Sequence, residues 1–262
     1  NLGVEMDYLN SIGHYANTAG KLFRGSVWGS YTGGHYSMHA AFSWSRLSSY
    51  DNGGLKDVED LKSSLASEDI PVNLNAMTGY RYLSGYLHNQ YAISKEREYH
   101  DSIEVIEDGR RVKRDTIKVE YIPLMTFSHI FETNNSNRRY IEKTANQGFY
   151  DTTYYDNSKT NDTTDVLTIR NTLAVTFCEE YNTKLKFGVT AFAMNECQRF
   201  MNDSVPYDSI YDYRWTNNTF VGGAIHKHSG SIVHYNVEGK VCVLGYKIGE
   251  FDVNGRLETK FK

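Results

Sequence analysis

Five of the nine histidine side chains, which can bind metal ions or transfer protons near neutral pH, lie in two groups along this sequence. His35 and His39 are four residues apart in a stretch where apolar and polar residues alternate. Residues four apart on an extended strand lie about 13 Å from each other, which is too far to share one metal ion. The second group comprises His226, His228 and His234. These three would meet only if the chain turned at 229–230, so the sequence predicts no metal site.

Acidic residues can indicate hydrolytic chemistry where they come in pairs, but Glu179-Glu180 has no partner at a fixed spacing. The sequence contains no GxSxG, HExxH, phosphate-loop or dinucleotide-binding motif. The three cysteines, Cys178, Cys197 and Cys242, lack the CxxC spacing that would indicate a zinc or redox site. We therefore expect no enzyme, no catalytic residue, no metal and no cofactor.

The composition favours β-strands joined by tight turns. Of 262 residues, 14% are aromatic, 21 are Gly and only 3 are Pro, whereas average usage would give roughly a dozen Pro at about 5%. No apolar run reaches the roughly 18 residues of a transmembrane helix, and no helical stripe of apolar residues is sustained. The net charge of −4 gives no reason to expect nucleic acid as a partner.

Apolar and polar residues alternate along almost the whole chain, with the period of two that indicates β-strands. The pattern is clear in residues 1–9, 35–44, 165–177 and 184–193, and it recurs more weakly elsewhere to give about ten strands. Many stretches are ten residues or longer, whereas ordinary strands have about five or six and a tilted membrane-crossing strand needs roughly 9–11. The sequence therefore predicts an all-β, antiparallel transmembrane β-barrel, with residues 1–262 as part of one barrel domain.

The alternation assigns each strand residue to one of two faces. The apolar face would contact lipid, and its candidates are Val4, Met6, Val27, Met38, Phe42, Leu173, Val175, Phe187 and Val189. The polar face would line a water-filled lumen, and its candidates are Glu5, Asp7, His35, His39, Arg170, Thr172, Lys184, Lys186 and Thr190. The mixed signs of these charges predict modest solute selectivity at most.

Two hairpins can be aligned through their turns. A two-residue turn at Gly33-Gly34 would pair Tyr31 with Tyr36 and place an apolar residue opposite every apolar residue. A three-residue loop at 181–183 would pair Val175 with Val189 in the same way. In both cases the apolar faces of the two strands coincide.

The predicted connections alternate in length, as in outer-membrane barrels. Short turns near 33–34, 181–183 and 228–230 contrast with long polar connections at 46–79, 133–164 and 197–212.

Residues 94–118 depart from this alternation because they are dense in charge and turn at Asp108-Gly109. We expect them to form a water-exposed hairpin extension at the short-turn rim. Pro123 should lie at a strand start or a bulge, since a closed barrel has no free edge for a proline.

Aromatic residues gather near predicted strand ends, as in the girdles at a membrane interface. They include Tyr31, Tyr36, Trp44 and Trp215. A soluble β-sandwich that binds carbohydrate through Tyr and Trp would show the same alternation and remains an alternative. The strand lengths and the scarcity of Pro favour the barrel.

Several sequence motifs together resemble the putative porin family, outer-membrane β-barrels of Gram-negative bacteria. They are NLGVEMDY (1–8), LFRGSVWGSYTGGHYSMHAAFS (22–43), DNGGL with DIPVNL (51–55, 69–74), PLMTFSHIFET (123–133), FGVTAF (187–192) and EGKVCVLGYKIGEF (238–251). The resemblance implies a larger barrel, with a signal peptide upstream and further strands downstream. The chain differs from that pattern by beginning inside a strand-like stretch and by ending on 260–262 without a terminal aromatic residue.

The resemblance implies a porin of the outer membrane that lets small solutes diffuse passively, with outer-membrane lipid and small solutes as partners. It supplies no catalytic residues. A homo-oligomer is compatible with this prediction. The other open alternative is an outer-membrane barrel without an open pore, such as part of a TonB-dependent receptor.

Overall fold

We describe a computed structural model of the chain. It describes residues 1–62, 64–107, 110–144, 146, 148–150, 152, 158–180, 187–202, 213–227 and 233–259, without the side chains of 99–107, 110–116, 202 and 213.

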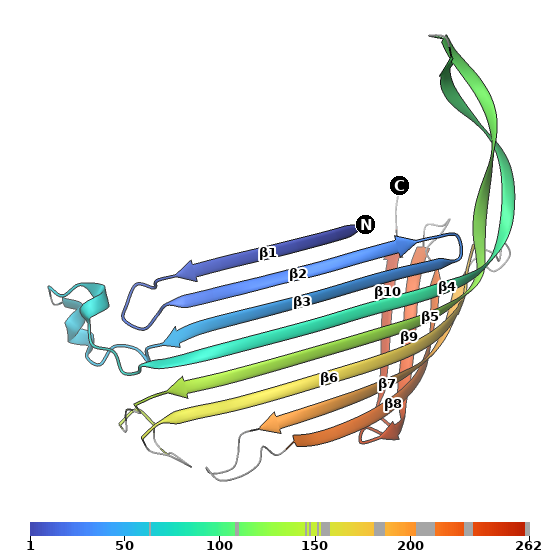
Figure 1. Cartoon of the computed structure of the whole chain (residues 1–262). Coiled ribbons are helices and arrows are strands. Elements are labelled where there is room, and N and C mark those ends of the chain that lie inside the picture. Colours follow the sequence, from blue (N-terminus) through green and yellow to red (C-terminus); the bar gives the residue numbers. More distant parts are fainter. Residues whose placement is uncertain are drawn as a thin grey trace.

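Ten strands form one sheet in which every strand pairs antiparallel with its neighbours in chain order (Figure 1). The strands are β1 (Leu2–Ser11), β2 (Gly20–Thr32), β3 (Tyr36–Asp51), β4 (Ala76–Glu107), β5 (Arg110–Glu142), β6 (Thr160–Phe177), β7 (Gly188–Asn202), β8 (Tyr213–Lys227), β9 (Val233–Gly245) and β10 (Phe251–Thr259). Two short 3-10 helices, η1 (Val58–Lys62) and η2 (Ser67–Asp69), lie between β3 and β4. The all-β antiparallel fold and the predicted number of strands are confirmed.

The sheet is a single curved layer. It curls so that β9 and β10 lie behind the strands at the front in Figure 1, with β1 and β10 at its two edges. The accessible surface is 18495 Å², whereas a compact monomer of this mass exposes about 11,700 Å². In the part of the chain that the structure describes, no second sheet packs on the first, so the alternative of a β-sandwich is wrong.

The connections define two rims. The long-loop rim carries the segments 12–19, 52–75, 143–159, 203–212 and 246–250, and the short-turn rim carries 33–35, 108–109, 178–187 and 228–232. The predicted contrast in length holds for the longest loops. It fails elsewhere: the connection 178–187 at the short-turn rim is longer than 12–19 and 246–250 at the long-loop rim, and 246–250 is as short as 228–232.

The β4–β5 hairpin extends far beyond its neighbours at the short-turn rim (Figure 1). β3 pairs with β4 only up to Tyr91, and β6 pairs with β5 only from Met125, whereas β4 and β5 pair with each other to Glu107 and Arg110. The predicted extension is therefore confirmed, although its turn at 108–109 lies outside the described residues.

Pro123 lies beside a β-bulge at the base of this extension. The register shifts there, so that Ile93 pairs with Met125 and Ser94 with Pro123. Leu124 is the extra residue, and its carbonyl oxygen accepts a hydrogen bond from Cys178 N at 3.0 Å. Since proline cannot donate to a ladder, it is accommodated where the β6 pairing has ended, as predicted.

The two predicted hairpin registers are wrong by two residues. Tyr31 pairs with Met38 rather than Tyr36, and Val175 pairs with Ala191 rather than Val189. In the first hairpin Gly33 N donates to Tyr36 O at 2.8 Å, so 34–35 form the turn instead of 33–34. The predicted loop 181–183 lies outside the described residues. A slip of two residues keeps every side chain on its face, so the face assignments survive.

Gly25 provides space for a large side chain on the neighbouring strand. It pairs with Trp44, and a Cβ atom at this position would overlap the indole ring. A Cβ at Gly29, on the same strand and face, would lie 3.5 Å from Leu2 Cδ1, which is ordinary contact. Covering a strand glycine with an aromatic ring helps to fix the register.

We predict that Gly25→Ala lowers the free energy of unfolding by about 1–3 kcal/mol, because Trp44 must leave its position. Gly29→Ala is the matched control and should change it little. Urea unfolding in lipid vesicles measures both, and equal midpoints for the two variants would contradict the Gly25–Trp44 contact.

Candidate functional site

The two faces of the sheet differ in how tightly their side chains are packed. Within the described strands, side chains less than a tenth exposed lie mostly on one face: Ala76, Thr78, Thr126, Glu142, Glu196, Asn218, Phe220 and Cys242. Met201 is the exception on the other face. Side chains converge on the concave side of a curved sheet and diverge on the convex side. We therefore call the first face inner and the second outer.

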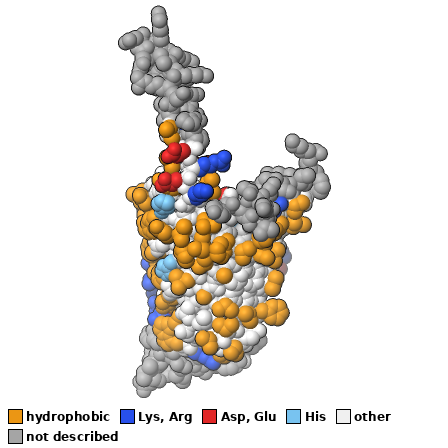
Figure 2. All heavy atoms as spheres, turned by 90° about the vertical axis from the view of Figure 1, so that its right-hand side faces the viewer, with side chains coloured by type: hydrophobic (Ala, Val, Ile, Leu, Met, Phe, Trp, Pro, Cys, Tyr) orange, Lys and Arg blue, Asp and Glu red, His pale blue; other side chains and the backbone are white. Residues whose placement is uncertain are grey.

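On several strands the apolar residues of the outer face extend over a similar length. This apolar belt runs from Tyr36 to Trp44 on β3, from Leu83 to Ile93 on β4 and from Leu167 to Phe177 on β6. On β8 it runs from Trp215 to Ile225. These spans of 9 or 11 residues match the roughly 9–11 residues with which a tilted strand crosses hydrocarbon. In Figure 2 hydrophobic side chains gather below the β4–β5 extension.

Aromatic residues mark both ends of the belt. Trp44 and Trp215 belong to one row of paired residues that crosses the sheet through Leu83, Leu167 and Arg199. At the short-turn end Tyr36 pairs with Tyr91. Such rings at two levels have the arrangement of interfacial girdles.

The predicted lipid-facing residues share the outer face. The register places there Val4, Met6, Val27, Met38, Phe42, Leu173, Val175 and Val189. Phe187 immediately precedes β7 and has the same parity. These side chains are not packed in a core: Leu173 is 63% exposed and Phe42 is 48% exposed.

The predicted lumen-facing residues share the inner face where they are described. The register places there Glu5, Asp7, His39, Arg170, Thr172 and Thr190. His35 lies in the turn before β3, where its ring contacts Tyr121 edge-on with centroids 4.9 Å apart. Lys184 and Lys186 lie outside the described residues.

Several of these side chains pair across strands. Asp7 forms an ion pair with Arg24, the rings of His39 and His88 stack with centroids 6.1 Å apart, and the hydroxyls of Thr176 and Thr190 are 2.8 Å apart. No group of three metal-binding side chains occurs among the residues that the structure describes.

Arg170 belongs to a charge network on the inner face. Its Nε donates to Glu196 Oε2 at 2.7 Å, and Lys247 Nζ donates to Glu196 Oε1 at 3.4 Å. The Glu196 side chain is 5% exposed. Lys247 is fixed in turn because its backbone N donates to Asn218 Oδ1 at 2.9 Å. The network joins β6, β7, β8 and the 246–250 connection, and sequence reasoning missed Glu196 and Lys247.

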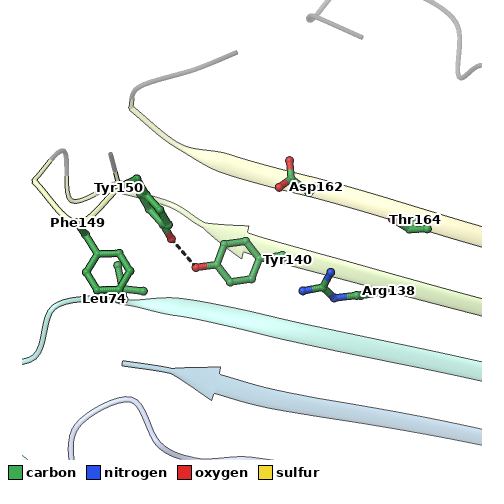
Figure 3. Close-up of a pocket in the computed structure, with 7 residues that line it drawn as sticks. All are labelled: Leu74, Arg138, Tyr140, Phe149, Tyr150, Asp162 and Thr164. Carbon is green, nitrogen blue, oxygen red and sulfur yellow. Dashed lines mark hydrogen bonds between the residues drawn. The ribbon is translucent and has the colours of Figure 1, made fainter. Parts of the chain in front are cut away.

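A pocket of about 270 Å³ opens on the inner face at the long-loop rim (Figure 3). It is lined by Leu74, Arg138, Tyr140, Phe149, Tyr150, Asp162 and Thr164. Its aromatic wall and its two charged side chains come from β5, β6 and the loops between strands. No sequence pattern indicated this pocket, because its loop residues have no fixed spacing from its strand residues.

A buried carboxylate anchors this pocket. Glu142 is fully buried and its Oε2 accepts a hydrogen bond from the Tyr150 hydroxyl at 3.1 Å. The hydroxyls of Tyr140 and Tyr150 are 2.8 Å apart. Burial raises the pKa of both phenols, and the neighbouring Glu142 carboxylate adds to the rise.

Asparagine side chains tie three long-rim loops together beside the pocket. Asn146 Nδ2 donates to Asn73 O and Asn17 Nδ2 donates to Leu74 O, both at 3.1 Å. Asn52 Nδ2 donates to Ala16 O at 3.2 Å. The loops 12–19, 52–75 and 143–150 therefore support one another.

Polar residues cross the middle of the apolar belt, which sequence reasoning also missed. Asn89 accepts from the Tyr36 hydroxyl at 2.7 Å, and His129 Nε2 lies 3.4 Å from Asn171 Oδ1. On the next strands Asn195 Nδ2 donates to Asn217 Oδ1 at 2.8 Å. These groups satisfy one another across strands, which lowers the cost of placing them on an apolar surface.

The comparison with protein families matches the description "Putative porin" over residues 1–262. The chain belongs to the putative porin family. Neither the comparison with curated proteins nor the comparison with solved structures gives a match. Among the described residues, no helix has the length and apolar character needed to span a membrane.

We predict that the rim pocket loses stability as the pH rises above about 10, the ordinary pKa of tyrosine. Because the pKa of Tyr150 is raised in the folded protein, the phenol stays protonated there while it ionises in an opened loop, so alkali favours opening. Hydrogen exchange of 143–150 measured against pH should show this loss. Tyr150→Phe should reduce it, and an unchanged pH profile in that variant would contradict the assignment.

We predict that Glu196→Gln lowers the free energy of unfolding by about 1–3 kcal/mol, since Arg170 and Lys247 lose their counter-charge in a partly exposed site. Glu5→Gln, an exposed inner-face residue, is the control. Denaturant unfolding measures the difference. Equal effects of the two substitutions would show that the network contributes nothing.

Proposed function

We propose that this chain forms the wall of a β-barrel in the outer membrane of a Gram-negative bacterium, and that small solutes cross the membrane through the barrel by passive diffusion. Membership of the putative porin family supports this role. The proposed partners are membrane lipid on the outer face and small solutes on the inner face. The role requires no catalytic residue, no cofactor and no nucleic acid.

The two-faced sheet is the observation that carries the proposal. Large apolar side chains on the outer face remain exposed, among them Leu173 at 63%, Val221 at 40% and Val253 at 66%. An exposed apolar surface of this extent is unfavourable in water. In hydrocarbon the same surface is stabilising. The backbone N–H and C=O groups of β2–β9 form hydrogen bonds with the strands on both sides, as a bilayer requires.

The inner face has the chemistry of a water-filled passage. It carries charges of both signs, many of them paired, such as Arg170–Glu196 and Lys240–Asp252. Paired charges keep the net potential small, so we expect weak ion selectivity. We expect a solute that enters from the long-loop rim to meet the aromatic and charged side chains of the rim pocket first.

The direct test is single-channel conductance in planar bilayers after addition of the purified protein. Stepwise, ohmic increases in current are expected, with weak preference between cations and anions. Stable insertion without any conductance would leave the barrel but overturn its role as a pore.

The face assignment makes a separate prediction about two adjacent residues. Leu173→Arg should cost about 2–4 kcal/mol in a bilayer if the residue lies near the midplane, because the charge would face hydrocarbon. Thr172→Arg, on the inner face, should be much milder. Folding yield and urea midpoints in vesicles measure both variants, and equal sensitivity would contradict the assignment of faces.

A further inference from the structure

Basic residues on the outer face form a group at the long-loop end of the apolar belt. Outside the β4–β5 extension, which itself carries Lys95, Arg97 and Lys118 on this face, five of the six Lys and Arg residues on the outer face of the described strands lie toward the long-loop rim: Lys21, Arg46, Arg81, Arg139 and Arg199. The sixth, Lys227, lies at the short-turn end. Outside the extension, the basic residues of this face therefore lie mainly toward the long-loop rim.

Four of these residues form a compact group on β2–β5, which we call the basic cluster: Lys21, Arg46, Arg81 and Arg139. Arg46 pairs directly with Arg81 across β3 and β4. Lys21 and Arg139 belong to the next outer-face row, linked through Ser48 and Gly79. All four residues are exposed.

The direct pairing of two arginines is unfavourable by itself. Residues directly opposite on antiparallel strands have Cβ atoms about 4.5–5.5 Å apart, and like charges there are destabilising. Outside the β4–β5 extension, where Glu120 pairs with Arg97, the one acidic residue on the described outer face is Asp165, and it pairs with Arg199 at 2.9 Å. Arg139 Nε has a neutral partner, Asn161 Oδ1, at 2.9 Å. Among the strand residues that the structure describes, no carboxylate of this face therefore lies beside the basic cluster.

The position of the cluster identifies the anion that would neutralise it. Arg46 and Arg81 lie two residues beyond Trp44 and Leu83, the last apolar residues of the belt on β3 and β4. In a bilayer this is the level of the lipid headgroups, immediately outside the hydrocarbon. Guanidinium groups bind phosphate through two parallel hydrogen bonds, and two opposed guanidinium groups can share one phosphate.

We propose that the basic cluster binds the phosphate of lipid headgroups in the leaflet at the long-loop rim. The inference rests on the proposed membrane location and adds a specific lipid-binding surface to it. The bound phosphate removes the repulsion between Arg46 and Arg81, and the cluster fixes the depth of β2–β5 in the bilayer.

The test compares lipid retention by the full chain in detergent micelles that contain phosphatidylcholine and phosphatidic acid, whose headgroup is a phosphate monoester. Native mass spectrometry counts the lipids of each kind that remain bound. Wild type should retain phosphatidic acid preferentially. Arg46→Gln with Arg81→Gln should reduce that preference by roughly tenfold or more, since each cation near a headgroup contributes substantially to anionic lipid binding.

Two control variants keep the result interpretable. Arg138→Gln removes a guanidinium group adjacent to Arg139 in sequence but on the inner face, so it should leave lipid retention unchanged. Arg46→Lys with Arg81→Lys keeps both charges but loses the planar guanidinium groups that bind phosphate through two hydrogen bonds. This variant should show an intermediate preference for phosphatidic acid. Circular dichroism of each variant confirms that the strands have formed.

The outcomes separate this inference from the proposed function. Loss of the preference in the Gln pair but not in Arg138→Gln supports the cluster. An unchanged preference in a folded Gln pair overturns it, even if the chain inserts and conducts. Competition by inorganic phosphate at the same concentration as the lipid would show a site for free phosphate and also overturn it. A chain that fails to insert into bilayers at all would instead contradict the proposed function.

Discussion

The hydrogen-bonding needs of the peptide backbone are the constraint on which this structure depends. A strand in hydrocarbon has no water to satisfy its N–H and C=O groups, so each group must pair with a neighbouring strand. One continuous antiparallel sheet meets this requirement for β2–β9, each of which is paired on both sides. Once the backbone is fixed in this way, side chains can only alternate between two faces. The apolar belt and the polar inner face are both consequences.

The inner face and the long-loop rim show how polar groups are accommodated in a structure without a packed core. Glu196 is buried because Arg170 and Lys247 both reach it, and Glu142 is buried because Tyr150 donates to it. The loops beside the pocket are joined by asparagine side chains that bind backbone carbonyls. In each case the buried polar group has a partner on another strand or loop, as the cost of leaving it unpaired requires. At the long-loop rim, hydrogen bonds join the loops, and apolar side chains such as Leu74 line the pocket beside them.

The sequence predicted what depends on local periodicity. Because the period of a strand is two, the alternation of residues such as Thr172 and Leu173 was enough to assign the faces. The turn was predicted at 33–34 but lies at 34–35, so the predicted pairing of the two strands is wrong by two residues. The alternation could not exclude this error, because both turns place apolar residues opposite apolar residues. The contact of Glu196 with Lys247, which are 51 residues apart, and the pocket around Tyr140 depend on loop paths that no local pattern encodes. The polar side chains of Asn89, His129 and Asn171 interrupt the alternation, but their mutual hydrogen bonds become visible only when the strands are aligned.

The central claim is that the outer face contacts hydrocarbon and the inner face contacts water. The most direct measurement places a nitroxide label at each residue from 167 to 177 on β6 in vesicles and records its collisions with oxygen and with a water-soluble nickel complex. The account predicts two opposite oscillations with a period of two residues: odd positions such as 173 accessible to oxygen and even positions such as 172 accessible to nickel. Equal accessibility of odd and even positions to the nickel complex would contradict this assignment of the two faces.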